Sequence, residues 1–146
     1  MVNLPSGLPE EINDDEDLAR FLTYSKYFSS TSVKPAAFLP NPKDRETSVS
    51  RHGRKPLKTL WKLGAEAAGE RTLYGAAIFK AADVRSALLD VFADEPPPRH
   101  AVIQKWPWLE IDLDLQKAQQ KERAILLSSA VGEPFLVGKS RNSADV

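Results

Sequence analysis

The side chains best suited to chemistry are the chain's two histidines and the arginine that precedes each of them. They form the pairs Arg51-His52 and Arg99-His100. Imidazole titrates near neutral pH, and guanidinium binds a carboxylate or phosphate through two parallel hydrogen bonds. Ser48 lies close to the first pair and adds a hydroxyl group, either as a donor or as a nucleophile. These residue types point to acid–base catalysis or to the binding of an anionic ligand.

Each Arg-His pair borders an apolar run that predicts a β-strand, over residues 47–52 and 100–104. If the two strands are neighbours in one sheet, the two pairs converge on one spot and form a candidate site. The alternative is that both pairs lie at strand ends, solvated or bonded to the backbone. The sequence favours this alternative, because it has no Ser/His/Asp order and no His-x-x-x-His spacing to sharpen the case for catalysis.

The segment Trp106-Pro107-Trp108 is the feature most typical of an interaction site. Tryptophan is enriched at binding hot spots, and a rigid proline between two indoles limits the entropy lost on binding. Trp106 and Trp108 are therefore the candidate partner-binding residues. The alternative is that one of them packs into the core of the domain.

Charge is unevenly distributed along the chain, although the formal net charge is zero. Six carboxylates lie between residues 10 and 17, and a stretch rich in lysine and arginine follows over residues 43–62. The basic stretch allows nucleic-acid binding, which would show a steep salt dependence. The chain has no excess positive charge and no known nucleic-acid-binding motif, so mutual neutralisation of the two regions is the favoured interpretation.

Composition excludes several classes of site. The chain has 146 residues and no cysteine, which excludes disulfides, thiol nucleophiles and cysteine-based zinc sites. Two histidines without acidic ligand spacing predict no metal site, and no motif predicts a cofactor. The N-terminus lacks a signal-peptide pattern and no window predicts a membrane span. We therefore expect a cytoplasmic monomer or homodimer without membrane contact.

Periodicity predicts a single α+β domain over residues 14–137, with a flexible arm at 1–13 and a flexible tail at 138–146. The expected sheet is mixed, with about four to five short strands and with helices packed mainly on one face. The predicted helices cover residues 14–28, 56–68, 81–89 and 113–131. The predicted strands cover 47–52, 72–79, 90–93, 100–104 and 135–137, together with a short or edge strand within the proline-bracketed segment 33–40.

The chain resembles a group of short uncharacterised bacterial proteins over roughly residues 15–131. The resemblance rests on the segments 34–40, 47–51 and 74–77, and on the proline stretch that leads to His100-Ala101. The group has no established activity, so the resemblance implies a bacterial origin and a single domain but assigns no catalytic residue.

The sequence favours a non-catalytic role, namely a small protein-binding or accessory module. Two alternatives remain open. One is a small enzyme or anion-ligand-binding domain that uses Arg51, His52, Arg99 and His100. The other is nucleic-acid binding through the basic stretch at residues 43–62.

Overall fold

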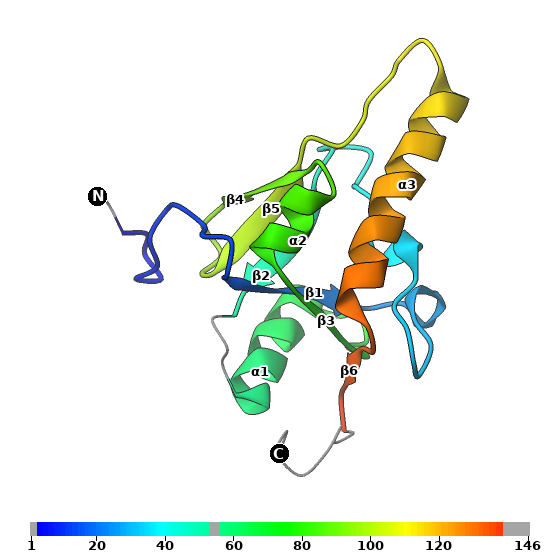
Figure 1. The fold of residues 1–146 in the computed structure, drawn as a ribbon. Helices are drawn as coiled ribbons and strands as arrows, with labels where there is room; N and C mark the ends of the chain where they lie inside the picture. Colours follow the sequence, from blue (N-terminus) through cyan, green and yellow to red (C-terminus); the bar gives the residue numbers. More distant parts are fainter. Residues whose placement is uncertain (1–2, 53–55, 139–146) are drawn as a thin grey trace.

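A six-stranded antiparallel sheet forms the centre of the molecule, with the strand order β4-β5-β2-β1-β3-β6 (Figure 1). The computed structural model describes residues 3–52 and 56–138. The strands are β1 (Asp17–Leu22), β2 (Thr47–Arg51), β3 (Gly75–Lys80), β4 (Asp90–Ala93), β5 (His100–Gln104) and β6 (Phe135–Leu136). The predicted α+β class and single domain are confirmed. The sheet has six strands, whereas about four to five were predicted. It is antiparallel rather than mixed, since each of its strand pairs is antiparallel.

The strand β1 comes from the segment predicted as a helix over residues 14–28, and the prediction of a strand within residues 33–40 is wrong, because residues 35–38 form a 3₁₀ turn that starts at Pro35. The helix prediction is wrong because β1 is a central strand between β2 and β3, and other elements pack on both faces of the sheet at this point. Leu18 and Ala19 have opposite orientations in the pleat, yet both are fully buried. A strand buried on both faces loses the alternating pattern, and its apolar residues then resemble those of a helix.

Helices cover both faces of this sheet. The main core cluster packs α2 (Ala81–Ser86), α3 (Leu113–Val131) and the 3₁₀ turn η2 (Pro35–Phe38) against one face. The helix α1 (Leu57–Ala68) packs its Leu60 against Ala19 and Ala76 on the other face. Two of the three α-helices therefore share a face. No helix in residues 3–52 and 56–138 is long and apolar enough to cross a membrane.

The segment that precedes β1, predicted as a flexible arm, lies against the domain. Ser6 donates two hydrogen bonds to the carboxylate of Glu95, from its backbone N at 3.0 Å and from its Oγ at 2.5 Å. Ile12 is buried in the main core cluster. The tail predicted at residues 138–146 falls outside the described residues except for Gly138.

A buried ion pair joins this segment to the sheet. Arg51 is fully buried, and its Nε and Nη2 both donate to the carboxylate of Glu16, with Nη2 at 2.7 Å from Oε1. Its Nη1 donates to the carbonyl oxygen of Pro9 at 2.8 Å. All three guanidinium nitrogens are therefore occupied. The pair fixes the start of β1 beside β2, where Leu18 is the register partner of Arg51.

We predict that Glu16→Gln destabilises the protein by about 3 kcal/mol, because it leaves the Arg51 charge buried without a counter-ion. The measurement is the free energy of unfolding in urea. The control is Glu110→Gln, which removes the exposed ion pair between Glu110 and Arg45 at 3.4 Å and should cost less than about 1 kcal/mol. Equal losses for the two variants would contradict the structural role of the buried pair.

Candidate functional site

The two Arg-His pairs lie on neighbouring strands. β2 and β5 pair over four residues, and Ser50 is the register partner of His100. The Arg51 backbone N donates to the Arg99 carbonyl oxygen at 2.8 Å, and the Arg99 Nη1 donates to the Arg51 carbonyl oxygen at 2.9 Å. The structure thus brings the backbones of the two pairs into contact.

The four side chains do not form one site. The guanidinium of Arg51 donates hydrogen bonds to the Glu16 carboxylate and the Pro9 carbonyl oxygen, and that of Arg99 donates to the Arg51 carbonyl oxygen. The Nδ1 atom of His100 lies 2.9 Å from the carbonyl oxygen of Asp94 and 3.2 Å from its carboxylate. Each arginine therefore has a structural contact, and His100 is held by its own loop.

His52 is in a different environment. Its side chain is buried, and neither ring nitrogen has a hydrogen-bond partner in the part of the chain that the structure describes. Its backbone N donates to the carbonyl oxygen of Asp17 at 3.3 Å, which continues the β1–β2 pairing. Burial lowers the pKa of His52 below its ordinary value, and the Arg99 charge lowers it further, while Asp17 opposes these effects. The folded protein therefore favours the neutral imidazole.

We predict that the stability of the protein falls with pH below about 6.5 partly through His52. Because the folded pKa lies below the unfolded one, the unfolded chain takes up the proton first as the pH falls. The measurement is urea unfolding at pH 7.5 and pH 5.5. The variant His52→Leu should lose less unfolding free energy between pH 7.5 and pH 5.5 than the wild type does. The control His100→Gln should keep the part of this loss that His52 causes. A parallel pH dependence in wild type and His52→Leu would contradict the assignment.

One cleft of about 680 Å³ opens beside β2. Ser48 and Ser50 of β2 line it, as does His100 of β5, together with Arg20 of β1. Of the side chains predicted as site residues, Ser48 and His100 reach this cleft, whereas Arg51, His52 and Arg99 are not in its lining. The candidate site is therefore only partly the one that the sequence indicates.

The cleft lies where β1 and β2 separate. β1 has six register pairs with β3 but only two with β2, at Leu18↔Arg51 and Ala19↔Ser50. Arg20 bridges the resulting gap: its Nε donates to the Ala37 carbonyl oxygen at 2.8 Å and its Nη1 to the Ser48 carbonyl oxygen at 3.0 Å. Sequence reasoning missed Arg20, although a lone arginine within an apolar run is a usable signal of a special role.

The two tryptophans predicted to bind a partner have different environments. Trp106 is buried in the main core cluster, and its Nε1 has no hydrogen-bond partner among residues 3–52 and 56–138. Trp108 is half-buried, and the guanidinium carbon of Arg45 lies 4.5 Å from its ring centroid. Trp106 therefore anchors the connector between β5 and α3, and Trp108 lies at the base of the segment that follows.

The end of this connector and the start of α3 form a protrusion, drawn in yellow in Figure 1, which extends beyond the sheet. We call residues 108–115 the tip. Ile111 is completely exposed, and Leu113 and Leu115 are 60% and 47% exposed. Side chains of this type normally pack inside a domain, so the tip presents an unusual concentration of exposed apolar groups.

The basic stretch at residues 43–62 does not present all of its cations on one surface. Arg51 is buried on Glu16, and Arg45 lies over Trp108 with a contact to Glu110 at 3.4 Å. Lys43, Lys58 and Lys62 are exposed. Residues 53–55 of this stretch lie outside the described residues. Nucleic-acid binding remains a prediction of the sequence alone.

No protein-family model matches this chain, and neither the search of curated proteins nor the search of solved structures finds a match. The resemblance to short uncharacterised bacterial proteins therefore stays a prediction. Within the two described ranges, no three or more His, Asp or Glu side chains are grouped so that they could hold a metal ion.

Proposed function

We propose that the protein is a protein-binding module whose tip docks into an apolar pocket rimmed by lysine or arginine on a partner protein. The observation that carries this proposal is the exposure of Ile111, Leu113 and Leu115 on one protruding segment. Apolar side chains in a rigid protrusion are suited to insertion, because they bury a large area at a small entropic cost.

The tip is held in place by contacts from α3. The buried side chain of Gln120 donates from Nε2 to the Pro107 carbonyl oxygen at 2.8 Å. The Oε1 atom of Gln116, which is also buried, accepts from the Leu109 backbone N at 2.7 Å. Asp112 caps α3 by accepting from the Leu115 backbone N at 3.0 Å. The apolar groups are thus presented on an ordered backbone, which reduces the ordering cost of binding.

The charges of the tip define the partner. Apolar and acidic residues alternate strictly over Leu109-Glu110-Ile111-Asp112-Leu113-Asp114-Leu115. Three carboxylates therefore flank the exposed apolar groups, and Arg45 pairs with one of them, Glu110, at 3.4 Å. A partner surface with an apolar centre and a cationic rim complements this arrangement, since complementary charge steers association and rejects wrong partners.

The test uses a photo-crosslinking amino acid in place of Ile111 in the full chain, expressed in its native host. The matched control carries the same crosslinker in place of Leu126, which is 50% exposed on α3. We expect one partner protein to crosslink at position 111 and not at position 126. A partner that crosslinks equally well at both positions, or only at position 126, would contradict docking through the tip.

Affinity for the captured partner gives a quantitative prediction. The double variant Ile111→Ser/Leu113→Ser should weaken binding by at least about tenfold, because it removes two exposed apolar anchors. Leu126→Ser should change the dissociation constant by less than about twofold, as expected of an apolar residue outside the interface. Raising the salt concentration should weaken binding of the wild type, and less so of Glu110→Gln/Asp114→Asn. Equal affinities of the double variant and the wild type would refute the proposal.

A further inference from the structure

The cleft beside β2 holds an arginine, Arg20, that has no acidic partner in the described part of the chain. Arg20 donates there to two neutral carbonyl oxygens, those of Ala37 and Ser48. None of the ion pairs found within residues 3–52 and 56–138 involves Arg20. A half-buried cation without a counter-ion is costly, because neutral carbonyls compensate only part of its lost hydration.

Arg20 is partly withdrawn from solvent and lies near a second cation, Arg71. Burial lowers the pKa of Arg20, and the neighbouring Arg71 cation lowers it further, while the Tyr27 phenol acts in the opposite direction. Guanidinium nevertheless stays charged at any physiological pH. Arg71 itself donates to the Ala68 carbonyl oxygen at 3.3 Å and to the Ala67 carbonyl oxygen at 3.5 Å, at the end of α1. Two guanidinium groups that form no ion pair with a described carboxylate therefore lie along one cleft.

Further donors and apolar side chains line the cleft, as do the carboxylates of Asp44, Glu46 and Glu66 away from the Arg20 hydrogen bonds. The Nη2 atom of Arg20 has no hydrogen-bond partner among the described residues, and Ser48 and Ser50 add hydroxyl groups to the same lining. Tyr27 and Leu39 line it as well. The volume of about 680 Å³ exceeds the requirement of a bare ion and suits a small organic molecule.

We propose that this cleft binds a small organic anion, with a carboxylate or phosphate head on Arg20 and Arg71 and an apolar body against Tyr27 and Leu39. The head replaces the missing counter-ion through charge-assisted hydrogen bonds, the strongest type available to guanidinium. The tip plays no part in this site, so ligand binding in the cleft and docking through the tip are separable.

The test is a ¹H–¹⁵N NMR titration of the full chain at constant ionic strength. Benzoate and phenyl phosphate serve as probes with an apolar body, and acetate and inorganic phosphate as the bare heads. We expect saturable shifts at Arg20, Ser48 and Ser50, with the aromatic probes at least about threefold tighter than their bare heads. Tighter binding of benzoate would identify a carboxylate as the preferred head group, and tighter binding of phenyl phosphate would identify a phosphate. Shifts scattered over the surface, or no saturation by about 50 mM, would overturn the proposal.

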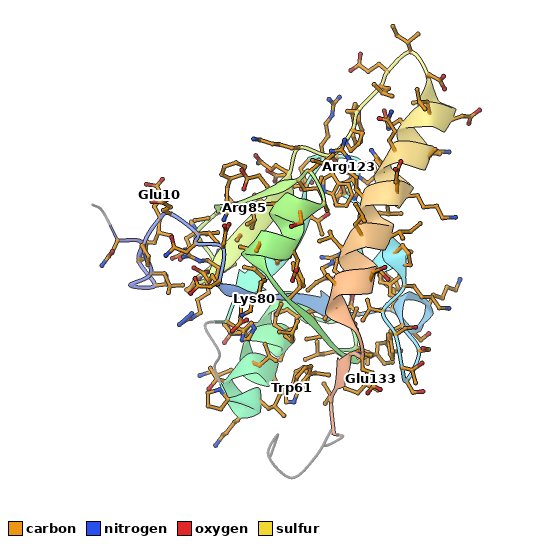
Figure 2. The ribbon with its side chains drawn as sticks, viewed as in Figure 1. Glu10, Trp61, Lys80, Arg85, Arg123 and Glu133 are labelled. Atoms are coloured by element: carbon orange, nitrogen blue, oxygen red, sulfur yellow. The ribbon has the colours of Figure 1, made fainter. Side chains whose placement is uncertain are left out.

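Charge variants test the sign of the interaction. The variants Arg71→Gln and Arg20→Lys should each weaken the binding of the aromatic probe by at least about fivefold. The variant Glu66→Gln, which removes a carboxylate from the lining, should strengthen this binding about twofold. Arg71 is exposed, so its variant remains informative if Arg20→Lys fails to fold. The matched control is Arg123→Gln on α3, outside the cleft (Figure 2). If Arg123→Gln weakened probe binding as much as Arg71→Gln does, the probe would be responding to the net charge of the protein alone, which would overturn the proposal.

Discussion

The fold depends on one buried ion pair, between Arg51 at the end of β2 and Glu16 just before β1. Arg51 is completely buried, so its charge is tolerated only because Glu16 and the Pro9 carbonyl oxygen occupy all of its nitrogens. The pair holds β1 beside β2 at the end where Leu18 and Ala19 pair with Arg51 and Ser50. Beyond that end the strands separate, and Arg20 fills the gap with bonds to Ala37 and Ser48. The cleft is a direct consequence of this geometry.

The same sheet positions the tip. β5 lies between β4 and β2, and the chain leaves it through Lys105, whose φ of 71° is in the left-handed region. This turn places Trp106 in the core, and Gln116 and Gln120 then bind the connector to α3. The burial of Trp106 and the two glutamine hydrogen bonds hold the connector in place while Ile111 stays exposed. The tip and the cleft thus use different parts of one rigid frame.

Sequence reasoning succeeded where local signals were strong. The predicted ranges of β4, β5 and α3 match the structure at both ends, because proline, glycine and an aspartate cap mark their limits. β1 was missed because burial on both faces removes the alternation on which strand prediction depends. The cleft could not be predicted, because it requires the strand order and the side-chain bridge of Arg20. The neighbouring positions of the two Arg-His pairs were anticipated, but the contact of Arg51 with Glu16 requires the tertiary fold.

We propose the tip as the surface through which this protein binds its partner. Hydrogen–deuterium exchange on the full chain, alone and in complex with the crosslinked partner, tests it most directly, because one experiment reports on the tip, the cleft and the basic stretch together. If the tip docks into the partner, the protection gained in the complex is concentrated in residues 105–118. Protection concentrated instead around Arg20 and Ser48, or over residues 43–62, with the tip unchanged, would contradict it.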